Sequence, residues 1–92
     1  MTMNKFNEKD LVLFDWDSFD CEFAKMILDG KMMMQIYRED HENLFGQIMK
    51  NHGKRVSRTK KKPSYVYQVY FFSIESFADV RESYLKLVNH HE

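Results

Sequence analysis

The residues best suited to bind a charged partner lie in a basic run from Lys50 to Lys62, KNHGKRVSRTKKK. This run contains seven Lys or Arg and no acid. Such side chains neutralise phosphates, and the counterions they displace give an affinity for nucleic acid that does not depend on base sequence. With about five phosphates engaged, the log–log slope of affinity against salt should be roughly −4 to −5. The candidate phosphate-binding residues are Lys54, Arg55, Arg58, Lys60, Lys61 and Lys62.

The segments around this run predict a hairpin that presents it. We expect a strand over 54–58, a connection over 60–64 and a second strand over 65–72. Pro63 cannot donate a ladder hydrogen bond, so it belongs in the turn or at the first residue of the strand. The second strand, YVYQVYFF, is apolar at both odd and even positions, which predicts a strand inside the sheet. The result is an antiparallel hairpin with a basic tip.

Three tyrosines of this second strand, Tyr65, Tyr67 and Tyr70, have two interpretations. Beside a basic run they could stack on unpaired bases, each contact contributing about 1–3 kcal/mol. On a strand with two apolar faces they are more often part of the core. Both interpretations stay open from the sequence.

Charge is divided unevenly along the chain, although its formal net charge is zero. Residues 1–49 carry five basic and ten acidic residues, a net charge of 5 − 10 = −5. The basic run could therefore be a solvated loop that shields an edge strand or meets the acidic half of a partner subunit. A further alternative is a protein-interaction inhibitor or adaptor, in which an acidic face of the first helix, formed by Asp17, Asp20 and Glu22, meets a basic partner.

Two acids one residue apart, Asp15 and Asp17, follow an apolar run in the segment LVLFDWDS. This segment resembles the first motif of haloacid-dehalogenase-type phosphatases and the strand-end acids of some metal-dependent nucleases. The resemblance implies magnesium-dependent phosphoryl transfer, with Asp15 as nucleophile or metal ligand and Asp17 as acid or ligand. Ser18 and Phe19 stand where the phosphatases have Gly-Thr or a similar pair. A helix N-cap turn explains the acids without catalysis, and we predict that the protein is not an enzyme.

Three helices are predicted from the spacing of apolar residues and from capping residues. The first spans 18–29, because Asp17 can cap its start and Gly30 suits the residue after its end. The second follows Asp40 and ends at Gly53, and the third begins with the capping box of Ser76 and Asp79 and runs to Val88.

We predict one α+β domain over residues 1–92, with 1–9 as a candidate flexible lead. The three helices would pack on a small mixed or antiparallel sheet. This sheet would have a central hairpin near 54–72 and a strand over 31–37, and 11–14 would be a short strand that either joins it or does not.

Cys21 is the single cysteine, so no intramolecular disulfide can form. The sequence has neither the apolar run of a signal peptide nor a stretch long enough to cross a membrane, and we expect a cytoplasmic protein. The histidines suggest no metal site, and no cofactor is expected. Methionine-rich surfaces adapt readily to partners, which makes a homodimer a reasonable hypothesis.

The chain is short, electrically neutral and rich in Met, Phe and Tyr, with tripled residues at 32–34 and 60–62. In its length and composition it resembles the small accessory proteins of large tailed phages. The resemblance implies host-takeover or counter-defence work by binding a host enzyme, a toxin or its nucleic acid, without chemistry. The leading hypothesis is a non-enzymatic nucleic-acid-binding protein that prefers RNA to DNA.

Overall fold

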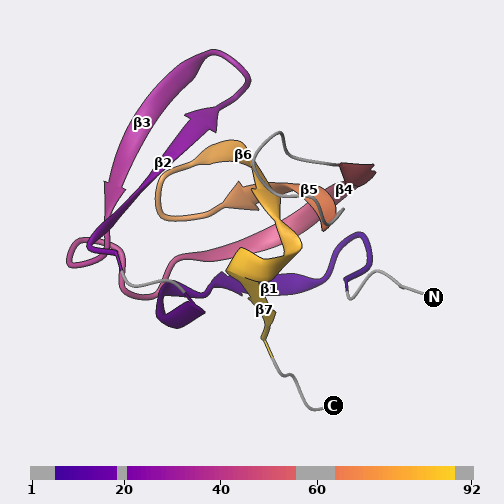
Figure 1. Ribbon diagram of the computed structural model, residues 1–92, viewed down its shortest axis with the longest axis horizontal. Coiled ribbons are helices and arrows are strands. Elements are labelled where there is room, and N and C mark those ends of the chain that lie inside the picture. The colour runs from indigo at the N-terminus through magenta and orange to yellow at the C-terminus, as the bar shows by residue number, and fades with distance from the viewer. Residues whose placement is uncertain (1–5, 19–20, 56–63, 89–92) are drawn as a thin grey trace.

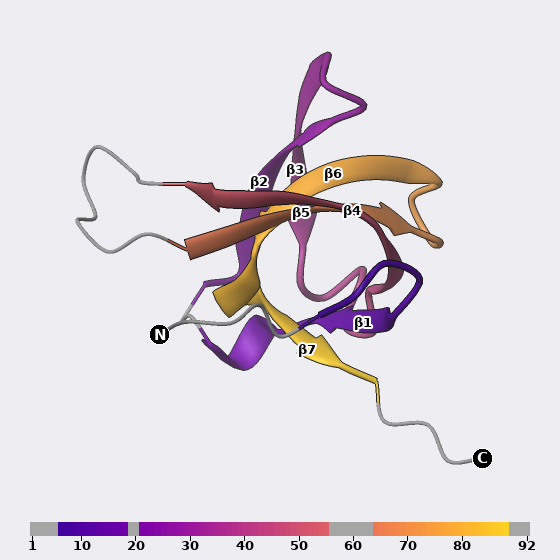
Figure 2. The same cartoon turned by 90° about the vertical axis from the view of Figure 1, so that its right-hand side faces the viewer.

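A computed structural model describes residues 6–18, 21–55 and 64–88. These residues form one antiparallel sheet of seven strands, which curls around its own buried side (Figures 1 and 2). The strands are β1 (Leu11–Phe14), β2 (Phe23–Leu28), β3 (Met32–Tyr37), β4 (Phe45–Arg55), β5 (Ser64–Phe71), β6 (Ser76–Arg81) and β7 (Leu85–Leu87). Their order across the sheet is β3-β2-β6-β5-β4-β1-β7. Two single-turn 3₁₀ helices, η1 (Trp16–Ser18) and η2 (Glu82–Tyr84), lie beside it.

The predicted α+β class is wrong, because the described residues are all-β and contain no α-helix. The first predicted helix, over 18–29, is the strand β2 followed by a tight turn. Met26 and Leu28 are buried while the residues beside them are exposed, which is the two-residue alternation of a strand. Asp29 and Gly30 have φ of 54° and 69°, as a type I′ hairpin turn requires. The glycine expected to end a helix therefore turns a hairpin.

The second predicted helix is mostly the strand β4. Its apolar residues fit a helical period as well as the strand alternation, so the pattern alone was ambiguous. Gly46 decides between them, because a Cβ there would lie 2.6 Å from Val69 Cγ1 and 2.8 Å from Tyr70 O on the adjacent strand β5. A glycine at this position therefore lets two strands approach closely, and its place is inside a sheet.

The third predicted helix, over 76–88, divides into β6, η2 and β7. Ala78 and Val80 are buried on alternate residues of β6, which matches a strand. Asp79, expected in a capping box with Ser76, instead lies 3.0 Å from the His52 side chain. The capping-box spacing was a coincidence of sequence.

The strands predicted over 11–14, 31–37 and 65–72 are present as β1, β3 and β5, and β1 pairs with both β4 and β7. The central hairpin is also present as the antiparallel pair of β4 and β5, although β4 begins at Phe45, well before the predicted residue 54. Residues 56–63, which include the end of the predicted first strand and most of the predicted connection, lie outside the described part of the chain.

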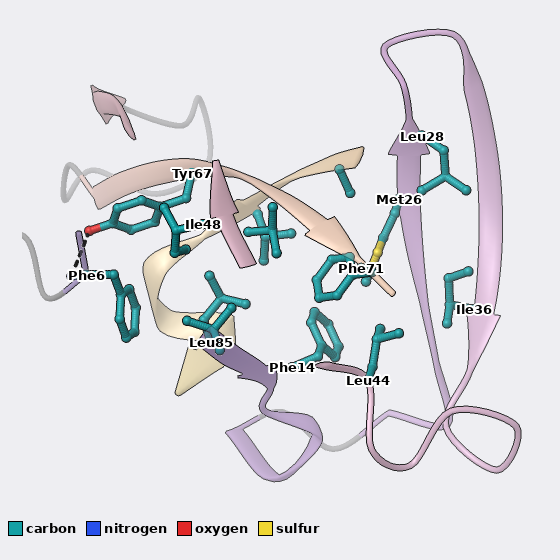
Figure 3. Packing of buried hydrophobic residues seen from close by; sticks show 14 of the residues in the cluster. Phe6, Phe14, Met26, Leu28, Ile36, Leu44, Ile48, Tyr67, Phe71 and Leu85 are labelled. Carbon is teal, nitrogen blue, oxygen red and sulfur yellow. Dashed lines mark hydrogen bonds between the residues drawn. The ribbon is translucent and has the colours of Figure 1, made fainter. Parts of the chain in front are cut away.

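The core lies on the concave side of the curled sheet, where side chains from all seven strands meet (Figure 3). Its largest fully buried side chains are Tyr67, Phe71, Leu44, Ile48, Val12 and Val69. Phe6, ahead of the first strand, is also buried, and its backbone N–H donates to the Tyr67 hydroxyl at 3.4 Å (Figure 3). None of the helices in the described residues is long and apolar enough to cross a membrane.

Candidate nucleic-acid interface

The pair of β4 and β5 extends beyond the rest of the sheet as a two-stranded arm. Neighbouring strands stop early, because β1 reaches only as far as Gln47 on β4 and β6 only as far as Val66 on β5. Past these positions, Lys54 and Arg55 pair across the arm with β5 alone. Figure 2 shows β4 and β5 side by side where they leave the body of the sheet. The fold thus carries the start of the basic run away from the core.

The two predicted site residues on the arm point to opposite faces. Lys54 pairs with Tyr65 on the concave face, and its Nζ lies 5.8 Å from the centre of that ring, a cation–π contact. Arg55 pairs with Ser64 on the outer, convex face, and both basic side chains are exposed. Phosphates could therefore be reached from either side of the arm. The other predicted site residues, Arg58, Lys60, Lys61 and Lys62, lie outside the described residues.

The outer face of the sheet carries three aromatic rings in mutual contact, which we name the outer aromatic cluster: Tyr70, Phe72 and Phe77. The Tyr70 ring centre lies 5.8 Å from that of Phe72 and 5.0 Å from that of Phe77, both edge-to-face. Phe72 is 45% exposed and Phe77 36% exposed. Phe45, also exposed, adjoins the cluster, since its carbonyl accepts the Phe72 N–H at 3.0 Å. Exposed rings of this kind offer stacking surfaces.

Basic side chains connect the arm to this cluster along the outer face. Arg81 lies opposite Val66, and its guanidinium donates to Ser64 Oγ at 3.0 Å. Lys50 lies opposite Gln68, one position closer to the cluster on that face. From Ser64 to Tyr70 is six residues, about 20 Å of extended strand. A chain of several nucleotides could therefore follow β5 from the arm to the aromatic rings.

Asp79 lies beside this basic path on β6, opposite Gln68. Its Oδ1 lies 3.0 Å from Nε2 of His52, which reaches it from β4. The contact ties β4 to β6 across the outer face of β5. It also gives this acid a hydrogen-bonding partner on the outer face.

The open question about the tyrosines has a different answer for each of them. Tyr67 is fully buried and donates from its hydroxyl to Glu82 Oε2 at 2.7 Å, and Tyr65 packs against the core. Tyr70 lies on the outer face. The prediction of an interior strand holds for the position of β5 in the sheet, but the apolar character of its second face does not mean burial. The sequence signal that could have shown this is Gln68 on the same face as Tyr70, since a buried face would rarely place an amide there.

The two acids of the segment that resembles a phosphatase motif each lie near a basic side chain. Asp17 Oδ1 lies 2.6 Å from a guanidinium nitrogen of Arg38, and both groups are well exposed. Asp15 Oδ1 lies 3.9 Å from Lys86 Nζ. Within the described ranges, no three His, Cys, Asp or Glu side chains gather closely enough to hold a metal ion. The described geometry supplies no third carboxylate for a magnesium site of the kind the resemblance implies.

The acidic residues proposed to form one face of the first helix do not lie on an α-helix in the described residues. Asp17 lies in the turn η1, Glu22 precedes β2, and Asp20 is outside the described residues. The Glu22 carbonyl accepts the Arg38 N–H at 2.8 Å, so this segment continues the β2–β3 pairing. The acidic residues of this segment therefore follow a turn and a strand end.

Comparison of the chain with protein-family models, with curated proteins and with solved structures finds no match.

Proposed function

We propose that the protein is a non-enzymatic nucleic-acid-binding protein that binds single strands and prefers RNA to DNA. The observation that carries the proposal is the β4–β5 arm, which places the exposed Lys54 and Arg55 beyond the last residues paired with β1 and β6, at the start of a run without acids. A cationic arm gives affinity through phosphates and counterion release. The outer aromatic cluster supports the preference for single strands, because only unpaired bases can stack on exposed rings.

RNA is favoured over DNA because recognition of RNA commonly uses irregular single strands whose bases splay onto aromatic side chains. A duplex would offer its phosphates to the arm but would keep its bases from the cluster. The predicted order of affinity is single-stranded RNA, then single-stranded DNA of the same sequence, then duplex. As part of the same proposal the protein is cytoplasmic, where an exposed free thiol such as that of Cys21 stays reduced.

The test uses fluorescence anisotropy of a labelled single-stranded RNA of about 12 nucleotides, within the site size of small sheet-based binders. Lys54→Ala with Arg55→Ala should weaken binding severalfold, and replacing Arg58, Lys60, Lys61 and Lys62 with Ala should weaken it further. The matched control is Lys25→Ala with Lys86→Ala, which removes the same charge from exposed positions on β2 and β7. Equal affinities for the parent, arm and control variants would refute phosphate binding by the arm.

The contribution of the outer aromatic cluster is tested separately with Phe72→Ala. One lost stacking contact of about 1–3 kcal/mol corresponds to roughly 5- to 150-fold weaker binding of single strands. Duplex binding should change little, since its bases do not reach the ring. Loss of affinity for both ligands in equal measure would show that Phe72 acts through the fold and not through stacking.

The protein-interaction alternative remains distinguishable in the same preparation. A protein that stays bound to the chain after nuclease treatment, and is unaffected by the arm variants, would favour an inhibitor or adaptor. Nucleic acid that co-purifies and leaves in high salt would favour the present proposal, whether or not the protein acts against a host or defence factor.

A further inference from the structure

The hairpin of β2 and β3 projects from the rest of the sheet. The register joins it to β6 at Leu28 and Ala78, next to a backbone hydrogen bond of 2.8 Å from Asp29 N to Phe77 O. In Figure 1 the hairpin lies at the edge of the domain, and this junction is next to its turn. Many of the exposed large apolar side chains lie on it: Phe23, Ile27, Met32, Met33, Met34 and Tyr37. Its outermost strand, β3, is one edge of the sheet.

The orientation of the β3 backbone follows from one hydrogen bond. Arg38 N donates to Glu22 O at 2.8 Å, so the even-numbered residues of this strand bond to β2. Because the pattern alternates, Met33, Gln35 and Tyr37 direct their backbone groups to the open edge. The Tyr37 carbonyl closes the next turn by accepting the Asp40 N–H, but the other groups of this row find no ladder partner in the described residues.

The β3 edge lacks the features that usually protect an edge strand. Residues 32–37, MMMQIY, contain no charge, proline or glycine, and the pairing with β2 runs through them without a bulge. Charges stand only at the two ends, with Lys31 before the strand and Arg38 and Glu39 after it. Met32 and Met33 are each 60% exposed. Such an edge is a template for another strand.

We propose that β3 pairs antiparallel with β3 of a second copy, around a two-fold axis at Gln35. A two-fold axis normal to the sheet keeps each side chain on its own face, so only residues of like parity can lie opposite one another. Centred on Gln35, the pairing joins the outward-directed backbone groups of Gln35 in the two copies to each other, and the Tyr37 N–H of each copy meets the Met33 carbonyl of the other. The Tyr37 carbonyl stays with the Asp40 and His41 N–H groups of its own turn. Met34 then faces Ile36, an apolar pair on the opposite face.

Charge complementarity favours this register, and it favours a second copy of the chain as the binding partner. In the same alignment the turn after β3 of one copy, which carries Glu39, comes beside Lys31 at the start of β3 of the other copy, and both side chains are exposed. Shifting the centre to Met34 would set Lys31 against Tyr37 and lose this pairing. The edge is thus complementary to itself at its ends and apolar in its middle. The proposal is independent of the nucleic-acid function.

The first test is the mass of the full chain by size-exclusion chromatography with light scattering. The expected mass is 22.4 kDa, twice the 11.2 kDa of one chain. Gln35→Pro should yield a monomer, because it removes an outward N–H and leaves the bonds to β2 in place. Gln35→Ala keeps that N–H and should stay dimeric. A parent protein at 11.2 kDa, or a dimer that survives Gln35→Pro with an unchanged circular dichroism spectrum, would overturn the proposal.

The second test fixes the register. In a Cys21→Ser chain, Gln35→Cys should form a disulfide-linked dimer on oxidation, because the two copies of residue 35 lie opposite each other, about 5.5 Å apart at Cα. Met33→Cys is the matched control, since its two copies would be four residues, about 14 Å, apart along the strands. Lys31→Glu should weaken the dimer up to about tenfold, and adding Glu39→Lys should restore it. Equal crosslinking at 33 and 35, or no rescue, would overturn the register.

Discussion

Gly46→Ala offers the sharpest test of how β4 and β5 meet at the centre of the sheet. An ordinary contact at a Cβ begins near 3.4 Å, and the new methyl would stand 2.6 Å from Val69 Cγ1, a shortfall of 3.4 − 2.6 = 0.8 Å. It would also lie 2.8 Å from the Tyr70 carbonyl oxygen, a backbone atom that cannot swing aside. Val69 is itself fully buried. Relief therefore requires the two strands to separate.

The expected loss in the free energy of unfolding is the cost of overpacking minus a smaller gain from the lower entropy of the unfolded chain. Overpacking costs about 1–3 kcal/mol, and the upper end applies here because backbone must move. Lower entropy of the unfolded chain returns about 0.4–1 kcal/mol for a Gly to Ala change. The net loss is about 2 kcal/mol, equivalent to a fall in Tm of roughly 8–16 °C for a domain of this size.

Urea denaturation followed by circular dichroism measures this loss, with Gly30→Ala as the control. Gly30 has open space around its Cβ position but a φ of 69°, so its substitution costs only the strain of a left-handed residue, about 1–2 kcal/mol. Both midpoints should fall with unchanged m-values. A Gly46→Ala protein as stable as the parent would refute the close approach of β4 and β5.

Two further predictions concern polar contacts. Tyr67→Phe removes the hydroxyl that donates to the Glu82 carboxylate and should lower the free energy of unfolding by about 1.5–3 kcal/mol in the same assay; an unchanged midpoint would contradict it. Asp15→Asn with Asp17→Asn breaks only exposed or distant ion pairs and should change stability by less than about 1 kcal/mol. Any magnesium-dependent phosphatase or nuclease activity in the preparation should survive that double change, and its loss would revive the enzyme interpretation.

Strands were predicted correctly where apolar residues are dense. Where apolar residues are sparser, strands were wrongly predicted as helices. Leu11 to Phe14 and Tyr65 to Phe72 are runs too short and too apolar for a surface helix, and both are strands. In 23–28 and 76–81 the apolar residues also satisfy a helical spacing, and what decides is backbone pairing with other strands. β6 pairs with the preceding strand β5, whereas β2 pairs with the following strand β3 and, at Leu28, with the distant β6, which no local pattern reveals.

Turn residues misled for a related reason. The Asp-Gly pair at 29–30 suits the end of a helix and a type I′ turn equally, because both need positive φ. At the candidate site, the sequence correctly predicted the antiparallel pairing that β4 and β5 make, while the predicted basic tip lies outside the described residues. It could not predict the outer aromatic cluster, because Phe77 reaches Tyr70 only through the pairing of β5 with β6.

The most direct test of the central claim is the salt dependence of single-stranded RNA binding by the full chain. Each phosphate contact contributes about −0.7 to the log–log slope on a single strand, compared with about −0.9 on a duplex, so five contacts predict about −3.5 on single-stranded RNA and the −4 to −5 given above on a duplex. Lys54→Ala with Arg55→Ala should reduce its magnitude by about 1.4, and the Lys25→Ala, Lys86→Ala control should leave it unchanged. A slope near zero, or one that the arm and control variants alter equally, would contradict phosphate binding by the β4–β5 arm.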